Sequence, residues 1–300
     1  MIFPKISVVI GAYNQLDPLT KVLNSFRFQN LSKEEFEVVL VDSSSTDGTA
    51  DFLKSFDAGY TFRYIIQENL GKVGARNRGV QEARGQYIFI TDADMIAHKE
   101  LLSQHVLAQE RSLEPSCFEG LTYNMTSLKW PADPETLSPY IERKYRSGAA
   151  LGWYYFLTGN ISFPKSLFES ENGFSSDFQG YGWEDLELGY RLSKRKIPLY
   201  YLKEAINYHY HVISEADEIR RNYHKGLSAR IFLKKHPELK WFLGLNPLSR
   251  FLFPRIKEKG RFYSFVQSEC YQSSHAWKHA FGAWFLKEYN YMKGILSTKR

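Results

Sequence analysis

The sequence predicts an α/β protein in which a mostly parallel sheet is flanked by helices and followed by a helical C-terminal extension. Three observations indicate this class. Short apolar, β-branched runs recur four times, segments with helical spacing separate them, and polar residues follow each run. Such alternation is typical of parallel sheets with right-handed crossovers, whose ligand sites lie at the carboxyl ends of the strands.

The four apolar runs are predicted to be buried strands. They cover residues 5–11, 36–41, 62–66 and 86–91. Between the first two, residues 17–28 place apolar side chains at helical spacing, and a second helix is expected after a turn in which Ser45 or Asp47 caps it. The polar clusters at the strand exits are Asn14, Asp42 with residues 43–46, Glu68 with Asn69, and Asp92 with Asp94.

The regular alternation weakens after about residue 110, where prolines punctuate loops. Residues 159–191 are dense in glycine, aromatic and acidic residues, and a helical pattern begins at Ser214. We therefore expect a ligand-binding half over residues 1–115, a second half of the same domain over 116–212, and an aromatic, basic helical extension over 213–300.

The composition of the 300 residues, 43% hydrophobic and 24% charged, excludes intrinsic disorder and fibrous repeats. The aromatic content of 16% favours rings that stack on ligands as well as fill the core. Cys117 and Cys270 show no spacing typical of a zinc site or a disulfide framework, so a reducing compartment is expected.

The first residues lack the pattern of a signal peptide, and no apolar run reaches about 18 residues. We expect a protein that is neither secreted by that route nor membrane-spanning, located in the cytoplasm. The net charge of +6 is concentrated in residues 241–300, which hold ten Lys or Arg and three Asp or Glu.

Asp92 and Asp94 provide two carboxylates where a strand ends, a spacing that suits Mg²⁺ or Mn²⁺ with positions left open for substrate phosphates. Two solvated loop aspartates are the alternative. Asp42 precedes a hydroxyl-rich turn and could either accept hydrogen bonds from a base or a ribose or be structural, whereas Asp47 is interpreted as structural.

Residues 67–79 place three glycines and three basic residues at the start of a helix, which offers N–H groups and positive potential to a phosphate. The segment does not match a P-loop, and GAYNQL after the first strand is not GxGxxG. The sequence therefore lacks the fingerprint motifs of P-loop ATPases and of Rossmann dehydrogenases.

The segment GYGWEDLELGYR places the acids Glu184 and Asp185 beside Trp183. A carboxylate there could act as a general base and the ring could stack on a sugar, although an acidic first helical turn would give the same pattern. His209 and His211 alternate, so one of them could complete a carboxylate metal site, the alternative being an ordinary core or surface histidine.

Taken in order, the motifs SVVIGAYN, VDSSSTDGT, ENLGKVGARNRG, TDADM, TGNISFPKSLF, GFSSDFQGYGWEDLELGYRL and YHYH resemble the GT-A glycosyltransferases of family 2. The resemblance covers roughly residues 5–211. It implies transfer of a sugar from a nucleotide-diphosphate donor, expected to be a UDP-sugar, to a saccharide hydroxyl with inversion. GYGWED also resembles an acceptor-binding segment of galactosyltransferases.

The resemblance also implies roles for individual residues. Asp42 would bind the base with Asn14 and the backbone of Ala12 and Tyr13 nearby, and Arg76 would contact the diphosphate. Asp92, Ala93 and Asp94 match the DxD motif, with Asp94 as the main ligand of Mn²⁺ or Mg²⁺ and Asp92 nearer the ribose. His209 matches a further metal ligand, with His211 as the alternative.

On the acceptor side, Asp185 matches the catalytic base of the ED motif, and Glu184 is its partner in that motif. Gly159 with Asn160 resembles a segment that shapes the donor-sugar pocket, Gly173 with Phe174 one that shapes the acceptor pocket, and Trp183 would stack on an acceptor sugar. The acceptor is expected to be a saccharide or lipid-linked saccharide of a surface polysaccharide pathway.

Residues 212–300 lie outside the resemblance. Their aromatic and basic residues form either a helical cap on the core or a surface for peripheral contact with the inner membrane face, and we favour membrane contact. Nucleic-acid binding is not expected, because no recognised motif is present. Two alternatives stay open: a retaining GT-A transferase and a non-catalytic relative that binds nucleotides or sugars. A nucleotidyltransferase is not expected, because the sequence lacks the Gly-rich loop that such an enzyme has after its first strand.

Overall fold

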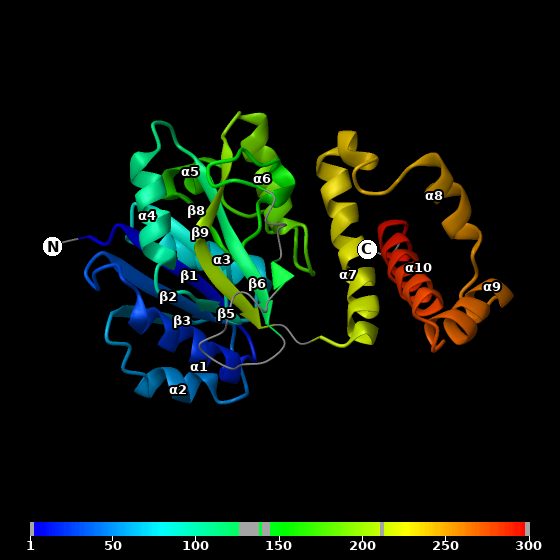
Figure 1. Cartoon of the computed structure of the whole chain (residues 1–300), viewed down its shortest axis with the longest axis horizontal. Helices are drawn as coiled ribbons and strands as arrows, with labels where there is room; N and C mark the ends of the chain where they lie inside the picture. The colour runs from blue at the N-terminus through cyan, green and yellow to red at the C-terminus, as the bar shows by residue number, and fades with distance from the viewer. Residues whose placement is uncertain (1–2, 126–137, 140–144, 211–212, 298–300) are drawn as a thin grey trace. The chain divides into compact units, whose positions relative to one another are not determined.

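The computed structural model describes residues 3–125, 138–139, 145–210 and 213–297. Close packing divides the chain into two compact units (Figure 1). The first unit comprises residues 1–176 and 185–212, and the second comprises residues 177–184 and 213–300. Each unit has a hydrophobic core of its own. The three-part division expected from the sequence stays a prediction.

The first unit is built on one mixed sheet with the strand order β3-β2-β1-β4-β8-β6-β9-β5, and β7 pairs with β6. The strands are β1 (Ile6–Ala12), β2 (Phe36–Asp42), β3 (Thr61–Ile66), β4 (Tyr87–Asp92), β5 (Met95–Ala97), β6 (Cys117–Met125), β7 (Ser138–Pro139), β8 (Ile161–Pro164) and β9 (Leu199–Tyr210). Strands β1 to β4 are parallel to one another, as are β6 and β9. Strand β8 runs antiparallel between β4 and β6.

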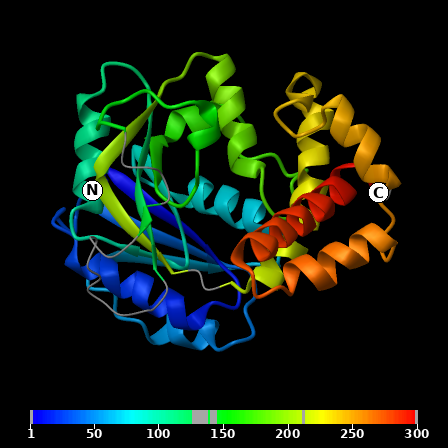
Figure 2. The same cartoon turned by 45° about the vertical axis from the view of Figure 1, so that its right-hand side comes forward.

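Helices cover both faces of this sheet (Figures 1 and 2). They are α1 (Leu16–Ser25), α2 (Thr49–Ser55), α3 (Gly71–Glu82), α4 (Leu101–Arg111), α5 (Lys165–Ser170) and α6 (Glu184–Lys194), with short 3₁₀ turns η1 (Phe26–Phe28) and η3 (Trp153–Tyr155). The α/β class is confirmed, and so are the four strands predicted in the first 91 residues.

The turn before α2 differs in detail from the sequence prediction. Neither Ser45 nor Asp47 occupies the N-cap; Gly48 does, with φ of 93°. Glycine is suited to this left-handed conformation because it has no Cβ. Asp47 still contributes, because its carboxylate accepts the N–H of Thr49 at 3.2 Å and that of Leu16 at 2.9 Å.

The second unit is helical where the structure describes it, apart from its connecting turns. Its elements are α7 (Glu215–Lys235), η4 (Pro237–Lys240), α8 (Pro247–Leu252), η5 (Phe253–Arg255), α9 (Arg261–Phe265), the π-helical turn η6 (Val266–Tyr271) and α10 (Ala276–Ile295). Ser214 caps α7 by accepting the N–H of Asp217 at 3.1 Å. Among the described residues, no helix combines the length and the apolar character needed to cross a membrane.

Helices α7 and α10 approach closely at a pair of glycines. A Cβ built on Gly226 would lie 2.1 Å from the carbonyl oxygen of Tyr291, and one on Gly294 would lie 2.2 Å from that of Tyr223. Beside this crossing, apolar residues of α7, η6 and α10 form the small core of the unit. The extension is therefore a folded helical unit with its own packing.

Candidate active site

Strand register brings several of the predicted donor-site residues to one edge of the sheet. Ala12 at the end of β1 pairs with Asp42 at the end of β2, and Gly11 pairs with Asp92 at the end of β4. At the far end of the strand order, Met95 of β5 pairs with His209 near the carboxyl end of β9. Because β1, β2 and β4 are parallel, their carboxyl ends present Asp42 and Asp92 on the same side.

The loops after β1 and β2 are joined by side-chain hydrogen bonds. The carboxylate of the fully buried Asp42 accepts the Ser45 hydroxyl at 2.5 Å and the Ser45 N–H at 3.1 Å. Asn14, at φ of 50°, accepts the N–H of Thr46 at 2.7 Å. Ala12 is buried while Tyr13 is exposed. The predicted base-binding residues therefore lie together, with Asp42 oriented by the turn that follows it.

Asp92 faces two cations of helix α3. Arg76 Nη2 donates to Asp92 Oδ1 at 2.7 Å, and Lys72 Nζ donates to Asp92 Oδ2 at 3.1 Å. Burial acts to raise the pKa of Asp92, but the positive charges of Lys72 and Arg76 outweigh it and hold that pKa below its ordinary value. In this structure the first aspartate of the DxD motif is thus held ionised by the predicted phosphate-binding helix.

Asp94 lies beside the histidine of the YHYH motif. His209 Nε2 is 3.7 Å from Asp94 Oδ2, and the backbone carbonyl of Asp94 accepts the N–H of Tyr210 at 2.9 Å. Ala93, between the two aspartates, is fully buried. His211 lies outside the described residues. The pairing of β5 with β9 therefore explains how residues more than a hundred positions apart become neighbours.

The donor set suits a divalent cation in part. A carboxylate and an imidazole together favour Mn²⁺ or a similar ion that accepts both oxygen and nitrogen ligands. Within the described ranges, no group of three or more His, Cys, Asp or Glu side chains is placed to hold a metal ion. Asp94 and His209 provide two possible ligands, so water and a ligand's phosphate oxygens would have to fill the other coordination positions. Their role as metal ligands stays a prediction.

Gly159 closes the space next to the DxD motif. Its carbonyl oxygen accepts the Thr91 hydroxyl at 2.9 Å and the Asn207 side-chain amide at 2.7 Å. A Cβ on Gly159 would lie 2.5 Å from the terminal methyl of Met95. A larger residue here would require the Met95 side chain to move.

Gly173 and Phe174 lie against helix α3, which carries Lys72 and Arg76. Phe174 is buried, and its backbone N–H and C=O both bond to the side chain of Asn77 on α3, at 3.0 and 2.9 Å. The guanidinium carbon of Arg76 lies 5.9 Å from the centre of the Phe174 ring. Gly173 has φ of 69°, and its carbonyl accepts Arg191 Nη2 at 2.7 Å. The segment thus supports α3, and its role in an acceptor pocket stays a prediction.

Asp185 lies in the first turn of helix α6, close to two buried acids. Glu184 precedes it and is buried. Glu119 of β6 is also buried, and its Oε2 accepts the N–H of Leu157 at 3.2 Å. Burial above all, and the negative charge of Asp185 in addition, raise the pKa of Glu119 well above its ordinary value. Asp185 itself is half-buried.

Trp183 belongs to the second unit and packs among aromatic rings there. Its ring centre lies 5.8 Å from that of Phe232 and 6.2 Å from that of Phe242, and its Nε1–H donates to the Lys225 carbonyl at 3.0 Å. The residue has φ of 77°, which is strained for a bulky side chain. Its predicted stacking on an acceptor sugar stays a prediction.

Three residues at this site were not predicted from the sequence as site residues. Lys72 precedes Arg76 by four positions on one helix face, a spacing that could have assigned it with Arg76 to the same anion. Asn207 lies two residues before His209, so strand alternation could have placed it on the same face. Glu119 gave no local signal, since a single acid in an apolar strand is not interpretable without its neighbours.

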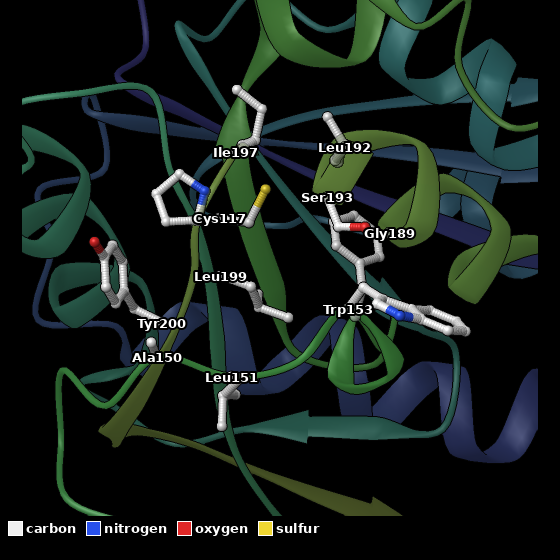
Figure 3. Close-up of a pocket in the computed structure, with 12 residues that line it drawn as sticks. Cys117, Ala150, Leu151, Trp153, Gly189, Leu192, Ser193, Ile197, Leu199 and Tyr200 are labelled. Atoms are coloured by element: carbon white, nitrogen blue, oxygen red, sulfur yellow. The ribbon is translucent and has the colours of Figure 1, made fainter. Parts of the chain in front are cut away.

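A separate pocket of about 130 Å³ lies elsewhere in the first unit (Figure 3). It is enclosed by α6, the start of β9 and the segment around η3, and Cys117, Trp153, Leu192 and Leu199 are among the residues that line it. It contains none of the predicted site residues. Its lining is largely apolar, so it does not provide the polar groups that a nucleotide needs.

The sequence matches two family models. "Glycosyl transferase family 2" matches residues 7–169, and "N-terminal domain of galactosyltransferase" matches residues 144–215. The chain is 31% identical over 231 residues to validoxylamine A glucosyltransferase of Streptomyces hygroscopicus subsp. jinggangensis, covering 67% of this chain and 54% of that protein. It is 26% identical over 269 residues to the uncharacterized glycosyltransferase YfnE of Bacillus subtilis, covering 73% and 68%. The chain thus spans about half the length of the validoxylamine glucosyltransferases it matches.

Solved structures show the same fold. Staphylococcus aureus TarS 1–349 in complex with UDP matches with a TM-score of 0.60 at 16% identity, covering 97% of this chain and 90% of that one. The mannosyltransferase PcManGT of Pyrobaculum calidifontis, in complex with GDP-Man and Mn²⁺, matches with a TM-score of 0.63 at 15% identity, covering 99% and 88%. With more than half of the chain matched by its family model, the protein belongs to glycosyltransferase family 2 and has the GT-A fold.

Proposed function

We propose that this protein is an inverting, metal-dependent glycosyltransferase that moves a sugar from a UDP-sugar to a saccharide hydroxyl in surface polysaccharide synthesis. The observation that carries the proposal is the edge of the sheet where Asp42, Asp92, Asp94 and His209 gather beside the cations of α3. The relative from Streptomyces is named a glucosyltransferase, and TarS has been crystallised with UDP and with UDP-GlcNAc, which supports a nucleotide-sugar donor.

The donor half of the site supplies positive charge where the leaving group forms. A departing nucleotide diphosphate develops negative charge, and preorganised cations stabilise it. Lys72 and Arg76 are proposed for this role, because both reach Asp92 at the end of β4 from successive turns of α3. Asp42 would accept hydrogen bonds from the uracil, with Asn14 and the backbone of Ala12 and Tyr13 beside it.

Asp94 and His209 would hold Mn²⁺ or Mg²⁺, with Asp92 as a second carboxylate nearer the ribose. When bound, the ion neutralises part of the charge on the diphosphate. Lys72 and Arg76 would position the diphosphate. The Gly159 carbonyl, held by hydrogen bonds from Thr91 and Asn207, would limit the space left for the donor sugar.

Asp185 is proposed as the general base. Its carboxylate takes the proton of the acceptor hydroxyl, the hydroxyl oxygen forms the bond to the anomeric carbon, and the bond from that carbon to the diphosphate breaks on the opposite face. The raised pKa of Glu119 favours its neutral form, so Glu119 adds no full negative charge beside Asp185. Trp183 is proposed to stack on the acceptor sugar, and Gly173 with Phe174 is proposed to shape the acceptor pocket.

The substitution Asp185→Asn tests this assignment. Because an amide cannot take the proton, we expect transfer to fall at least a hundredfold, to an order of magnitude typical of a lost general base, while donor binding is kept. Transfer is followed by product NMR with UDP-sugars and saccharide acceptors, and Asp51→Asn, at an exposed ion pair on α2, is the matched control. A product that keeps the anomeric configuration of the donor would show a retaining enzyme, and unchanged transfer by Asp185→Asn would refute the base.

The acceptor is proposed to be a saccharide carried on a lipid, with the protein held peripherally on the inner membrane face through the second unit. A nucleotide-binding relative without catalysis would bind donor and turn none over. The transfer assay separates such a relative from an enzyme, because it measures product formation and not binding.

A further inference from the structure

One face of the second unit carries an unusual concentration of exposed, large apolar side chains. On helix α10, the exposed positions among residues 276–285 are all apolar. Three of them recur at helical spacing, with exposed fractions of 70% for Trp277, 40% for Phe281 and 55% for Trp284. Exposed single hydrophobic residues are ordinary, but a stripe of this kind marks an interaction surface.

Helix α9 extends the stripe. Phe262 and Phe265 are 52% and 54% exposed, and α9 lies beside α10 in both views (Figures 1 and 2). The Phe262 ring centre lies 5.3 Å from that of Phe285, which in turn lies 6.4 Å from that of Phe281. Phe281 and Trp284 are 6.0 Å apart. The five exposed residues, Phe262, Phe265, Trp277, Phe281 and Trp284, are termed the aromatic face below.

Basic residues accompany the aromatic face. Residues 241–297 contain eight Lys or Arg against three Glu and no Asp. Lys257, Lys259 and Arg261 are exposed at the start of α9, and Lys278 Nζ lies 5.7 Å from the centre of the Trp277 ring. This combination distinguishes the face from an ordinary protein–protein interface, in which lysine is depleted.

We propose that the aromatic face is an interfacial membrane-binding surface whose partner is a bilayer containing anionic lipid. Tryptophan and phenylalanine are suited to the boundary between headgroups and acyl chains, and lysine and arginine next to them are attracted to anionic headgroups. The opposite side of α10 packs against α7 and the small core through Phe285, Leu286 and Tyr289, so the face can enter the interface while the unit stays folded. The proposal names the surface for the membrane contact proposed above.

Vesicle co-sedimentation of the full chain tests this surface without donor or acceptor, so its outcome is independent of transfer activity. Vesicles of phosphatidylcholine alone are compared with vesicles containing about one part phosphatidylglycerol in four, at low and at high salt. The wild type is expected to sediment with the anionic vesicles at low salt and much less with the neutral ones.

The combined variant Trp277→Ser, Phe281→Ser, Trp284→Ser is expected to lower the partition coefficient at least tenfold, as an order of magnitude for lost aromatic insertion. The matched control replaces three exposed apolar residues of the first unit, Phe28→Ser, Leu107→Ser and Leu113→Ser, and should bind as the wild type does. A second variant combines Lys257→Gln, Lys259→Gln and Arg261→Gln. It should bind the anionic vesicles more weakly than the wild type does, with no change in binding to the neutral ones. Circular dichroism melting shows whether each variant stays folded.

Three results would overturn the proposal. The wild type could fail to sediment with anionic vesicles, or the tryptophan and phenylalanine variant could bind as tightly as the control. The third is a change from oligomer to monomer in that variant by sedimentation velocity, with vesicle binding unchanged, which would assign the face to a second copy of the chain. If the variant with three serines does not fold, Trp277→Ser alone, at the most exposed position, gives the same comparison.

Discussion

His105 on α4 is fully buried with both ring nitrogens hydrogen-bonded. Its Nε2 lies 2.9 Å from Asn160 Oδ1, and its Nδ1 lies 2.9 Å from the Ser162 hydroxyl. Asn160 uses its amide to donate to the carbonyls of Leu121 and Ala205, so its oxygen is the acceptor and Nε2–H is the donor. The neutral ring therefore satisfies the network next to Gly159, and burial lowers the pKa of His105 to about 4.

This lowered pKa predicts an acid-labile contribution to stability. The unfolded chain binds a proton near the ordinary pKa of 6.5, whereas the folded chain resists it down to about 4. The stabilisation is thus complete above pH 6.5 and is lost as the pH falls toward 4, by about 3 kcal/mol. Urea unfolding at several pH values should show that the wild type loses this amount relative to His105→Gln. Parallel pH profiles of the two proteins would contradict the assignment.

At the residue scale, the sequence predicted which residues lie at the candidate site but not which hydrogen bonds each side chain makes. Asp92 and Asp94 were assigned from their position after a strand, and the structure places them at the expected edge. The sequence did not show that Lys72 and Arg76 bond to Asp92, because this depends on how α3 packs on the sheet. The metal-ligand role of Asp92 stays a prediction.

At the element scale, the parallel strands were predictable because fully buried strands read as continuous apolar runs. The antiparallel additions were not. Strand β8 inserts between β4 and β6, and β5 is only three residues long, so neither has enough sequence for a periodic pattern. His209 was therefore assigned from a motif. That Asp94 lies next to His209 follows only from the pairing of β5 with β9.

The crossing of α7 and α10 provides a prediction about elements. Helix propensity alone would make Gly226→Ala stabilising by about 1 kcal/mol. Because the new Cβ would lie 2.1 Å from the Tyr291 carbonyl and 2.9 Å from Gly294 Cα, both backbone atoms, the helices must separate. We expect a net destabilisation of about 1–3 kcal/mol, typical of overpacking.

Thermal and urea unfolding of Gly226→Ala measure this effect. His224→Ala, at an exposed position of the same helix, is the control for a change of side chain without a change in packing. A Gly226→Ala protein as stable as the wild type, or more stable, would show that the two helices do not meet as closely as the glycines indicate.

At the scale of the whole molecule, the chain combines a GT-A unit with a second unit of helices. The composition of the tail predicted an aromatic and basic extension, and the structure shows that some aromatic residues build its core while others remain on its surface. The sequence could not separate these two groups, since both contain phenylalanine on the same helix: Phe281 of α10 is exposed and Phe285 is buried. It also could not show that Trp183 packs within this unit.

The account centres on a nucleotide site that uses Asp94 and a divalent ion. Calorimetric titration with UDP, GDP, dTDP and CDP, with and without Mn²⁺, on the wild type and on Asp94→Asn tests it most directly. We expect UDP to bind in the presence of Mn²⁺, and to bind at least tenfold more weakly, as an order of magnitude, when either Mn²⁺ or the Asp94 carboxylate is removed. Binding of none of the four nucleotides, or UDP binding indifferent to both Mn²⁺ and Asp94, would contradict the account.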